Sequence, residues 1–207
     1  MTFAKNMPKI LALAGSYREH SYNKRVLNIA VEGARAAGAT VTVIDLRDFP
    51  LPILNMDDVA ANGFDPHAAR LQDLLAEHDG ILIASPEYNG SIPGGLKNAI
   101  DWASRQSEKH KMNEVFIGKV AAMITASPGS FGGIRCLSHL RGVFSIMGVN
   151  VLPSEIAVGF VGQKFEGDGT AMTDEKMRSI LEKLGADLAA MLKKTHGDIG
   201  FVSDTSS

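Results

Sequence analysis

The 207-residue sequence predicts an α/β fold in which helices cover both faces of a five-stranded parallel sheet. Two observations lead to this prediction. Short apolar runs alternate along the chain with segments whose apolar residues recur at helical spacing. Four of the runs read as continuous apolar segments rather than as an alternation of apolar and polar residues, as expected for strands buried on both faces of a sheet. Strands and helices that alternate in this way form parallel sheets covered by helices.

The first third of the chain predicts two strands and one helix. The run 10–14 is predicted to be the first strand, because it is apolar throughout and stops at Gly15. Apolar residues then recur at helical spacing over 26–37, which predicts a helix that ends at Gly38. The β-branched run 41–44 predicts the second strand.

The middle of the chain begins with a long irregular loop, predicted over 46–66 because prolines, Asn and Gly recur there. Leucines at helical spacing predict a second helix that begins near Pro66, and the apolar run 81–84 predicts the third strand. A third helix is predicted over 93–104, with Pro93 near its first turn.

The remaining elements follow the same alternation. The charged segment 105–114 is expected to be a solvated connection, and the run 120–125 predicts the fourth strand. Apolar residues over 137–147 predict a fourth helix that Gly148 ends. A short fifth strand is predicted to begin at 150–152.

A last helix, predicted over 177–192, completes a domain that we expect to span residues 1–195. Residues 196–207 are polar, and they are predicted to be a tail that frays. Five strands of this kind suit the sheet order 2-1-3-4-5. In that order a crevice lies beyond the carboxyl ends of strands 1 and 3, so the loops after these strands should carry the chemistry.

Composition narrows the possible functions. Apolar residues make up 45% of the chain and charged residues 21%, which suits a globular core. The net charge of -2, without a long Lys/Arg block, argues against a nucleic-acid partner. No run approaches the roughly 20 apolar residues of a membrane span, and residues 1–9 lack the apolar stretch of a signal peptide. The single Cys136 fits a reducing, cytoplasmic compartment.

The loop after the first strand contains groups that suit a phosphate. It has neither the G-x-G-x-x-G nor the G-x-x-x-x-G-K pattern of nucleotide-binding loops. It does place hydroxyl groups, an amide and a guanidinium just before a predicted helix, where backbone N–H groups attract anions. The side chains are Ser16, Arg18, Ser21 and Asn23. An ordinary helix cap by Ser21 or Asn23, with Arg18 solvated, explains the same pattern equally well.

The loop after the third strand is rich in proline and glycine, which allow the backbone to approach a flat ring closely. Tyr88 could cover one face of such a ring. A plain connection between strand and helix is the alternative, because Pro and Gly occur in many loops without function. Glu87 is then a solvated carboxylate.

Three segments together resemble a known family. They are Gly15-Ser16-x-Arg18-x-x-Ser21-x-Asn23, residues 86–102 beginning Pro86-Glu87-Tyr88-Asn89-Gly90-Ser91, and residues 127–135 beginning Ser127-Pro128-Gly129. On these segments the chain resembles the NADPH-dependent FMN reductase family, which includes flavodoxin-like quinone, chromate and azo reductases. The likeness covers about residues 8–152 and continues more weakly through the last helix. Tyr17 and Pro128 depart from the family pattern.

The resemblance implies a flavodoxin-like fold with non-covalent FMN. A hydride would pass from NADPH or NADH to FMN, and then on to a small acceptor such as a quinone or a flavin. The phosphate would be held by Ser16, Arg18, Ser21 and Asn23. The isoalloxazine ring would be lined by Pro86, Glu87, Tyr88 and Asn89, and on its other side by Ser127, Gly129 and Gly132. The family is commonly dimeric or tetrameric, so a homodimer or homotetramer is expected, with the helix after Pro93 at the contact.

Because FMN carries the redox chemistry, no catalytic residue of the protein is expected. The six histidines show no metal-ligand spacing, so no metal site is predicted. Cys136 is predicted to be a small packing residue near the start of a helix. Two alternatives remain at this point, a flavodoxin-type electron carrier without nicotinamide activity and a flavin-binding regulator without turnover. Carrier flavodoxins are usually strongly acidic, whereas this chain is nearly neutral.

Overall fold

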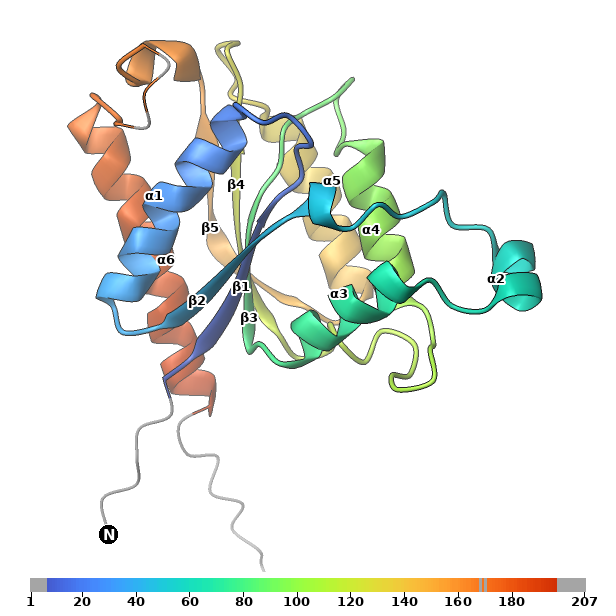
Figure 1. Ribbon diagram of the computed structural model, residues 1–207. Helices are drawn as coiled ribbons and strands as arrows, with labels where there is room; N and C mark the ends of the chain where they lie inside the picture. Colours follow the sequence, from blue (N-terminus) through green and yellow to red (C-terminus); the bar gives the residue numbers. More distant parts are fainter. Residues whose placement is uncertain (1–6, 168, 170, 197–207) are drawn as a thin grey trace, which may run out of the picture.

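The computed structural model describes residues 7–167, 169 and 171–196, except for the side chain of His196. Its strands form one parallel sheet in the order β2-β1-β3-β4-β5, which confirms the predicted fold class (Figure 1). The strands are β1 (Lys9–Ala14), β2 (Thr40–Asp45), β3 (Gly80–Ala84), β4 (Val120–Ala126) and β5 (Asn150–Val158). The α-helices are α1 (Tyr22–Ala36), α2 (Met56–Asn62), α3 (Pro66–Ala76), α4 (Gly94–Ser104), α5 (Ile134–Ile146) and α6 (Glu175–His196).

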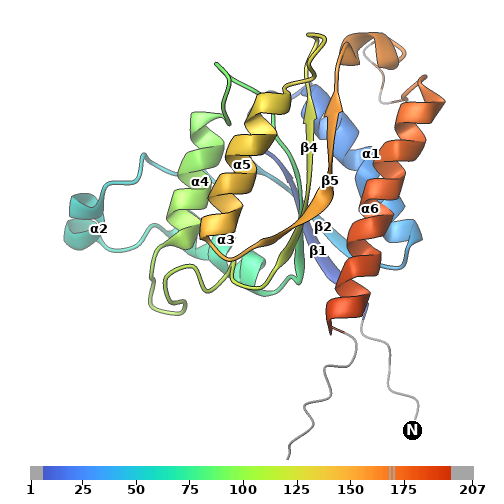
Figure 2. The ribbon, with the colours of Figure 1, turned by 180° about the vertical axis from the view of Figure 1, so that it is seen from behind.

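Helices cover both faces of the sheet, with α1 and α6 on one face and α3, α4 and α5 on the other (Figures 1 and 2). Each face has its own apolar core. In β1, Ile10 and Ala12 face α1 and α6, whereas Leu11 and Leu13 face the other three helices. Side chains on both faces of the sheet are therefore buried, which explains why the central strands read as continuous apolar runs.

The edge strand β2 differs from the prediction. It pairs only with β1, and none of its residues is fully buried. The side chain of Val43 is 44% exposed. The expectation that the run 41–44 is buried on both faces is wrong, because β-branched residues also suit a half-covered strand at the edge of a sheet.

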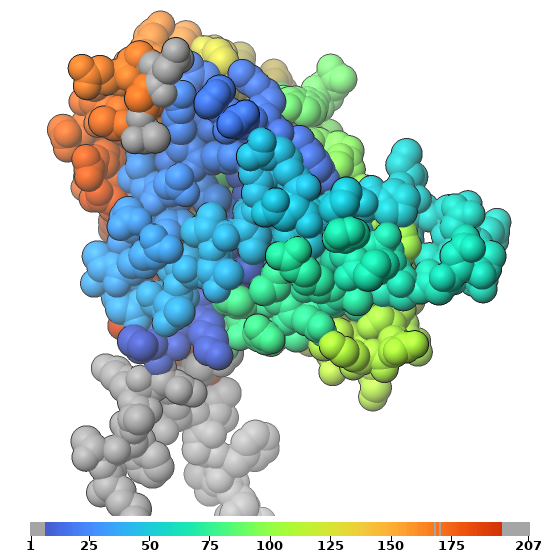
Figure 3. All heavy atoms as spheres, viewed as in Figure 1, coloured from blue at the N-terminus to red at the C-terminus, as the bar shows by residue number. Residues whose placement is uncertain are grey.

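The predicted irregular loop 46–66 contains one α-helix, α2, and a short 3-10 turn over Leu46–Asp48. The side chain of Asn55 caps α2 by accepting a hydrogen bond from the N–H of Asp57 (3.1 Å). No residue of α2 is buried, so it has no apolar periodicity by which the sequence could reveal it. Figure 3 shows this part of the chain projecting from the body of the molecule.

The base of this projection is fixed to α4. The indole N–H of Trp102 and the side-chain amide of Asn98 both donate to the carbonyl of Pro52, each over 2.8 Å. The Asn98 side-chain oxygen also accepts from the N–H of Leu54 (2.9 Å). Phe64 meets the Trp102 ring edge to face, with 5.4 Å between the centroids. Two α4 side chains thus hold both ends of the projecting segment.

The C-terminal elements are longer than predicted. β5 extends to Val158, and its pairing with β4 shifts in register between Ala121 and Met123. The sequence predicted only a short strand, whereas β5 continues through Pro153 without a break. α6 reaches His196, and the rest of the predicted tail, 197–207, lies outside the described residues. Within the described residues, no helix is long and apolar enough to span a membrane.

Candidate functional site

The loops after β1, β3 and β4 lie together at one edge of the sheet, at the top of Figure 1. Backbone hydrogen bonds fix the first residues of the loops after β1 and β3 to the neighbouring strand of the sheet. The N–H of Gly15 donates to Ala84 (2.8 Å), and that of Ser85 donates to Ile124 (2.9 Å). The strand order therefore brings together loops that are far apart in the sequence, as the predicted crevice requires.

A pocket with an empty volume of about 440 Å³, its open mouth included, lies between these loops. Eight of the eleven predicted site residues line it, namely Ser16, Arg18, Ser21, Asn23, Pro86, Glu87, Tyr88 and Ser127. The other three, Asn89, Gly129 and Gly132, are not among its lining residues. Sequence reasoning missed Tyr22 and Ala126 as lining residues, and it treated Pro128 only as a departure from the family pattern.

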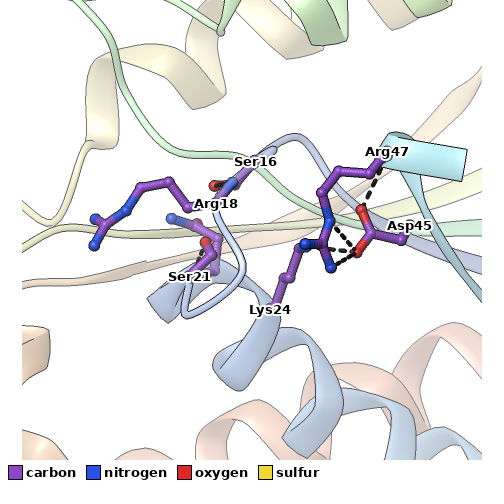
Figure 4. Close-up of polar contacts among 7 residues, drawn as sticks. Ser16, Arg18, Ser21, Lys24, Asp45 and Arg47 are labelled. Carbon is purple, nitrogen blue, oxygen red and sulfur yellow. Dashed lines mark hydrogen bonds and ion pairs between the residues drawn. The ribbon is translucent and has the colours of Figure 1, made fainter. Parts of the chain in front are cut away.

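The loop after β1 turns two buried serines toward the amino end of α1. Ser16 Oγ accepts a hydrogen bond from the N–H of Arg18 (3.3 Å). Ser21 is the helix cap, and its Oγ accepts from the N–H of Asn23 (3.2 Å). Arg18 is exposed, and Figure 4 shows its side chain on the opposite side of the loop from the Lys24–Asp45–Arg47 cluster. The loop therefore combines hydroxyl groups, a helix amino end and an exposed guanidinium.

The side chain of Asn23 is engaged by the backbone of the next loop. Its Nδ2 donates to the carbonyl of Ala126 (2.9 Å), and its Oδ1 accepts from the N–H of the same residue (3.0 Å). Asn23 is buried, so this pair of hydrogen bonds ties the start of α1 to the end of β4. The structure thus shows a supporting role for a side chain that the family pattern assigns to the phosphate.

A charged cluster stands beside the same loop. The carboxylate of Asp45 accepts from Lys24 Nζ (2.6 Å) and from Arg47 Nη2 (2.8 Å) (Figure 4). Burial alone would raise the pKa of Asp45, but the hydrogen bonds from Arg47 and Lys24 outweigh burial and hold the pKa well below its ordinary value. Asp45 therefore stays ionised and joins the end of β2 to α1.

Tyr17, one of the two departures from the family pattern, lies over the first turn of α4. A Cβ atom at Gly95 would stand only 2.4 Å from Tyr17 Cε2, so the glycine makes room for the ring. Burial, and in second place the charge of Asp45, raises the pKa of the Tyr17 hydroxyl. The larger residue at position 17 is thus accommodated by the absence of a side chain at position 95.

The loop after β3 forms a tight turn at the site. The backbones of Tyr88 and Ser91 exchange two hydrogen bonds, of 2.9 and 3.1 Å. Between them Asn89 and Gly90 have positive φ angles of 52° and 80°, as an Asn-Gly turn requires. Tyr88 is exposed at the pocket, whereas Asn89 occupies the turn itself.

Glu87 is not a solvated carboxylate, as it would be if the loop after β3 were a plain connection. Its Oε2 accepts from the N–H of Arg135 (2.9 Å) and from the N–H of Cys136 (3.3 Å), at the amino end of α5. Its Oε1 accepts from Arg135 Nη1 (3.0 Å). A carboxylate at this place is stabilised by the helix dipole. Glu87 thereby joins the loop after β3 to the loop after β4.

The loop after β4 is held by its own hydrogen bonds. Ser127 Oγ accepts from the N–H of Gly129 (3.1 Å), and the carbonyl of Gly129 accepts from the N–H of Gly132 (3.2 Å). Gly132 has a φ of 63°, and a Cβ there would lie 2.7 Å from the backbone nitrogen of Gly159. Gly132 therefore lets this loop pack against the one after β5.

Two predictions about other chemistry can be compared with the structure. Cys136 is buried in the first turn of α5, as predicted, and burial raises the pKa of its thiol. Among the residues that the structure describes, no group of three or more His, Cys, Asp or Glu side chains could hold a metal ion.

Comparison with known proteins decides the family. The family model for NADPH-dependent FMN reductase matches residues 8–163. The chain belongs to the NADPH-dependent FMN reductase family. The predicted resemblance is therefore confirmed, and with it an NAD(P)H-dependent oxidoreductase that uses FMN on a flavodoxin-like fold. The electron-carrier alternative is not favoured.

Relatives within this family match nearly the whole chain. An NAD(P)H-dependent FMN reductase of Pseudomonas aeruginosa is 35% identical over 190 residues, which cover 91% of this chain and 97% of that protein. An NAD(P)H:quinone oxidoreductase of Solanum tuberosum is 38% identical over 199 residues, covering 94% and 97%. The structure of the flavoenzyme NAD(P)H:(acceptor) oxidoreductase FerB from Paracoccus denitrificans has a TM-score of 0.76 at 28% identity, covering 91% and 98%.

The residues present fit the cofactor of the FMN reductase family. At the start of a helix, backbone N–H groups have no partner within the helix. In α1, among the residues that the structure describes, a side chain caps only the N–H of Asn23. The remaining N–H groups, two buried serines and Arg18 together suit a phosphate. The tight turn at Asn89 leaves Tyr88 exposed beside the pocket, where a flat ring could stack.

Proposed function

We propose that the pocket between the loops after β1, β3 and β4 binds FMN non-covalently. The phosphate then lies at the amino end of α1, and the isoalloxazine ring lies between Tyr88 and the loop that begins at Ser127. The observation that supports this assignment most strongly is that eight residues of the family pattern, from three separate loops, line one pocket. Ser16, Ser21 and Arg18 are the proposed phosphate ligands, whereas Asn23 supports the loop through Ala126.

When bound, FMN supplies the redox chemistry of hydride acceptance and electron release. The work of this chain is to position the reactants and to exclude competing reactions. Tyr88 offers an aromatic face beside the pocket, and the Glu87–Arg135 pair fixes the spacing of the two loops on either side. No side chain of the pocket is assigned a proton transfer in this scheme.

We also propose that the acceptor is a small molecule such as a quinone or a free flavin, and that the chain acts in the cytoplasm as a homodimer or homotetramer. The outer faces of α4 and α5 support an assembly, because they form a groove lined by Ile92, Gly94, Gly142, Val143 and Ile146, among others. The side chain of Ile146 is 84% exposed there. Exposed apolar surface of this kind often marks a protein contact. Light scattering on the eluted protein tests this, and a monomeric mass would contradict it.

The first experiment is an absorbance spectrum of the purified protein, followed by anaerobic addition of NADPH. Flavin bands that bleach on addition would support FMN binding and hydride transfer together. Bound flavin that keeps its colour with both NADPH and NADH would instead favour an electron carrier. Colourless protein that fails to take up added FMN would overturn the proposal.

A further inference from the structure

Next to Glu87, which lines the pocket, the guanidinium of Arg135 is held between that carboxylate and an aromatic ring. Its Nη1 donates to Glu87 Oε1 (3.0 Å), and its central carbon lies 5.4 Å from the centroid of the Phe131 ring. Both side chains remain open to solvent, since Arg135 is 59% and Phe131 is 68% exposed. Arg135 is therefore oriented without being buried.

Glu87 leaves most of this guanidinium free. One carboxylate oxygen of Glu87 is occupied by the backbone N–H groups of Arg135 and Cys136, so only the other oxygen meets the guanidinium. Within the described part of the chain, Nε and Nη2 of Arg135 have no hydrogen-bond acceptor. A guanidinium has five donors in a planar fork. The free edge of Arg135 is thus suited to bind an anion through two hydrogen bonds.

The other exposed arginines near the pocket are less suited to a second anion. Arg47 donates from both Nε and Nη2 to Asp45, so its fork is already occupied. Arg18 lines the pocket itself and is the proposed ligand of the FMN phosphate. Arg135, which pairs with the pocket residue Glu87, therefore has a fork that remains available to the other reactant.

An exposed aromatic face beside a free guanidinium edge fits a purine that carries a phosphate. The purine stacks on the ring, and the phosphate pairs with the guanidinium. The nicotinamide donor contains such a group in its adenosine half, which bears a 2′-phosphate in NADPH and a hydroxyl in NADH. We propose that Phe131 and Arg135 form a subsite for the adenosine 2′-phosphate of NADPH. This inference rests on the proposed function, because it places the donor at the FMN pocket.

Binding of two probes tests the subsite without turnover. The FMN-loaded protein is titrated with adenosine 2′,5′-bisphosphate and with 5′-AMP in a calorimeter. The bisphosphate should bind about tenfold more tightly, because it adds charge-assisted hydrogen bonds. Arg135→Ala should remove this preference, and Arg135→Lys should retain only part of it, because an ammonium lacks the fork. Phe131→Leu should weaken both probes about fivefold, since both carry the purine.

Arg70→Ala is the matched control. Arg70 also lies over an aromatic ring, 4.7 Å from the centroid of Phe49, but it belongs to α3 and not to the segments around the pocket. This variant should keep the preference for the bisphosphate. Anaerobic reduction of the bound flavin by NADPH and by NADH gives a second measurement. Arg135→Ala should raise the KM for NADPH about tenfold relative to that for NADH.

The outcomes separate the inference from the proposed function. If Arg135→Ala still binds FMN and is reduced, but keeps the preference for the bisphosphate and for NADPH, the subsite is wrong and the FMN pocket stands. If the unmodified protein binds no FMN, both proposals are overturned. If both probes bind the unmodified protein equally, the structure has no 2′-phosphate subsite at Arg135.

Discussion

Several side chains that the family pattern links to the ligand use their polar atoms to hold the loops of the site. The amide of Asn23 is bonded to Ala126, and the carboxylate of Glu87 is bonded to the first turn of α5. The sequence could predict that both lie at the pocket, because each follows the carboxyl end of a central strand. It could not predict their partners, since these depend on loops about 100 and 50 residues away in the chain.

Asp45 gives a prediction of pH dependence at the level of one residue. Because its pKa is lowered in the folded state, its contribution to stability is fully present above the pKa of the unfolded chain, near 4, and is lost as the pH falls toward the folded value. Asp45→Asn should lower the free energy of unfolding by about 1 kcal/mol at pH 7. The difference should shrink from pH 4 downward. Urea denaturation of both proteins at several pH values between about 2 and 7 measures this difference in the free energy of unfolding.

Asp187→Asn is the control for Asp45. Asp187 pairs with Lys183 on α6 over 2.7 Å, but the two side chains are 43% and 71% exposed. Such an exposed pair within one helix is screened by water and contributes only about 0.5 kcal/mol or less. An effect of Asp45→Asn no larger than that of this control would mean that the cluster beside the phosphate loop does not stabilise the fold.

At the level of helices and strands, the sequence predicted those elements that bury an apolar face. The predicted runs correspond to β1, β2, β3, β4 and the start of β5. Helical spacing, and for α4 the proline near its first turn, predicted every α-helix except α2. α2 was missed because none of its residues packs into either core. The extension of β5 was missed because the register shift interrupts its pattern. Apolar periodicity therefore locates the layers but not the segments that project from them.

The contact between α1 and α6 depends on glycine. A Cβ at Gly33 would lie 1.9 Å from the carbonyl oxygen of Glu182, so Gly33→Ala must push the two helices apart. We expect the free energy of unfolding to fall by about 2 kcal/mol or more, as in other overpacked cores. Gly142→Ala in α5 is the control, because nothing lies within 4 Å of its added Cβ. Chemical denaturation should show the control unchanged or more stable by up to about 1 kcal/mol. If Gly33→Ala and Gly142→Ala changed the free energy of unfolding equally, the close contact between α1 and α6 would be contradicted.

For the whole molecule, the position of the site follows from the order of the strands. A sheet in the order 2-1-3-4-5 brings the loops after β1 and β3 to neighbouring positions, and the sequence alone predicted that these loops carry the site. What the sequence could not give is how each loop faces the pocket, because that depends on the packing of Tyr17 on Gly95 and of Gly132 on the loop after β5.

Because the pocket joins three loops, its ligand should stabilise the whole fold. A ligand that binds only the folded state at about a hundredfold its Kd adds about 2.7 kcal/mol to the free energy of unfolding. FMN should therefore raise the melting temperature more than riboflavin at equal concentration, since riboflavin lacks the phosphate. In Arg18→Ala the difference between the melting-temperature shifts caused by FMN and by riboflavin should become smaller, because the exposed guanidinium beside α1 is lost. In Arg70→Ala this difference should persist. Calorimetric melting curves provide the comparison. If FMN and riboflavin shift the unmodified protein equally, the phosphate does not bind at the amino end of α1.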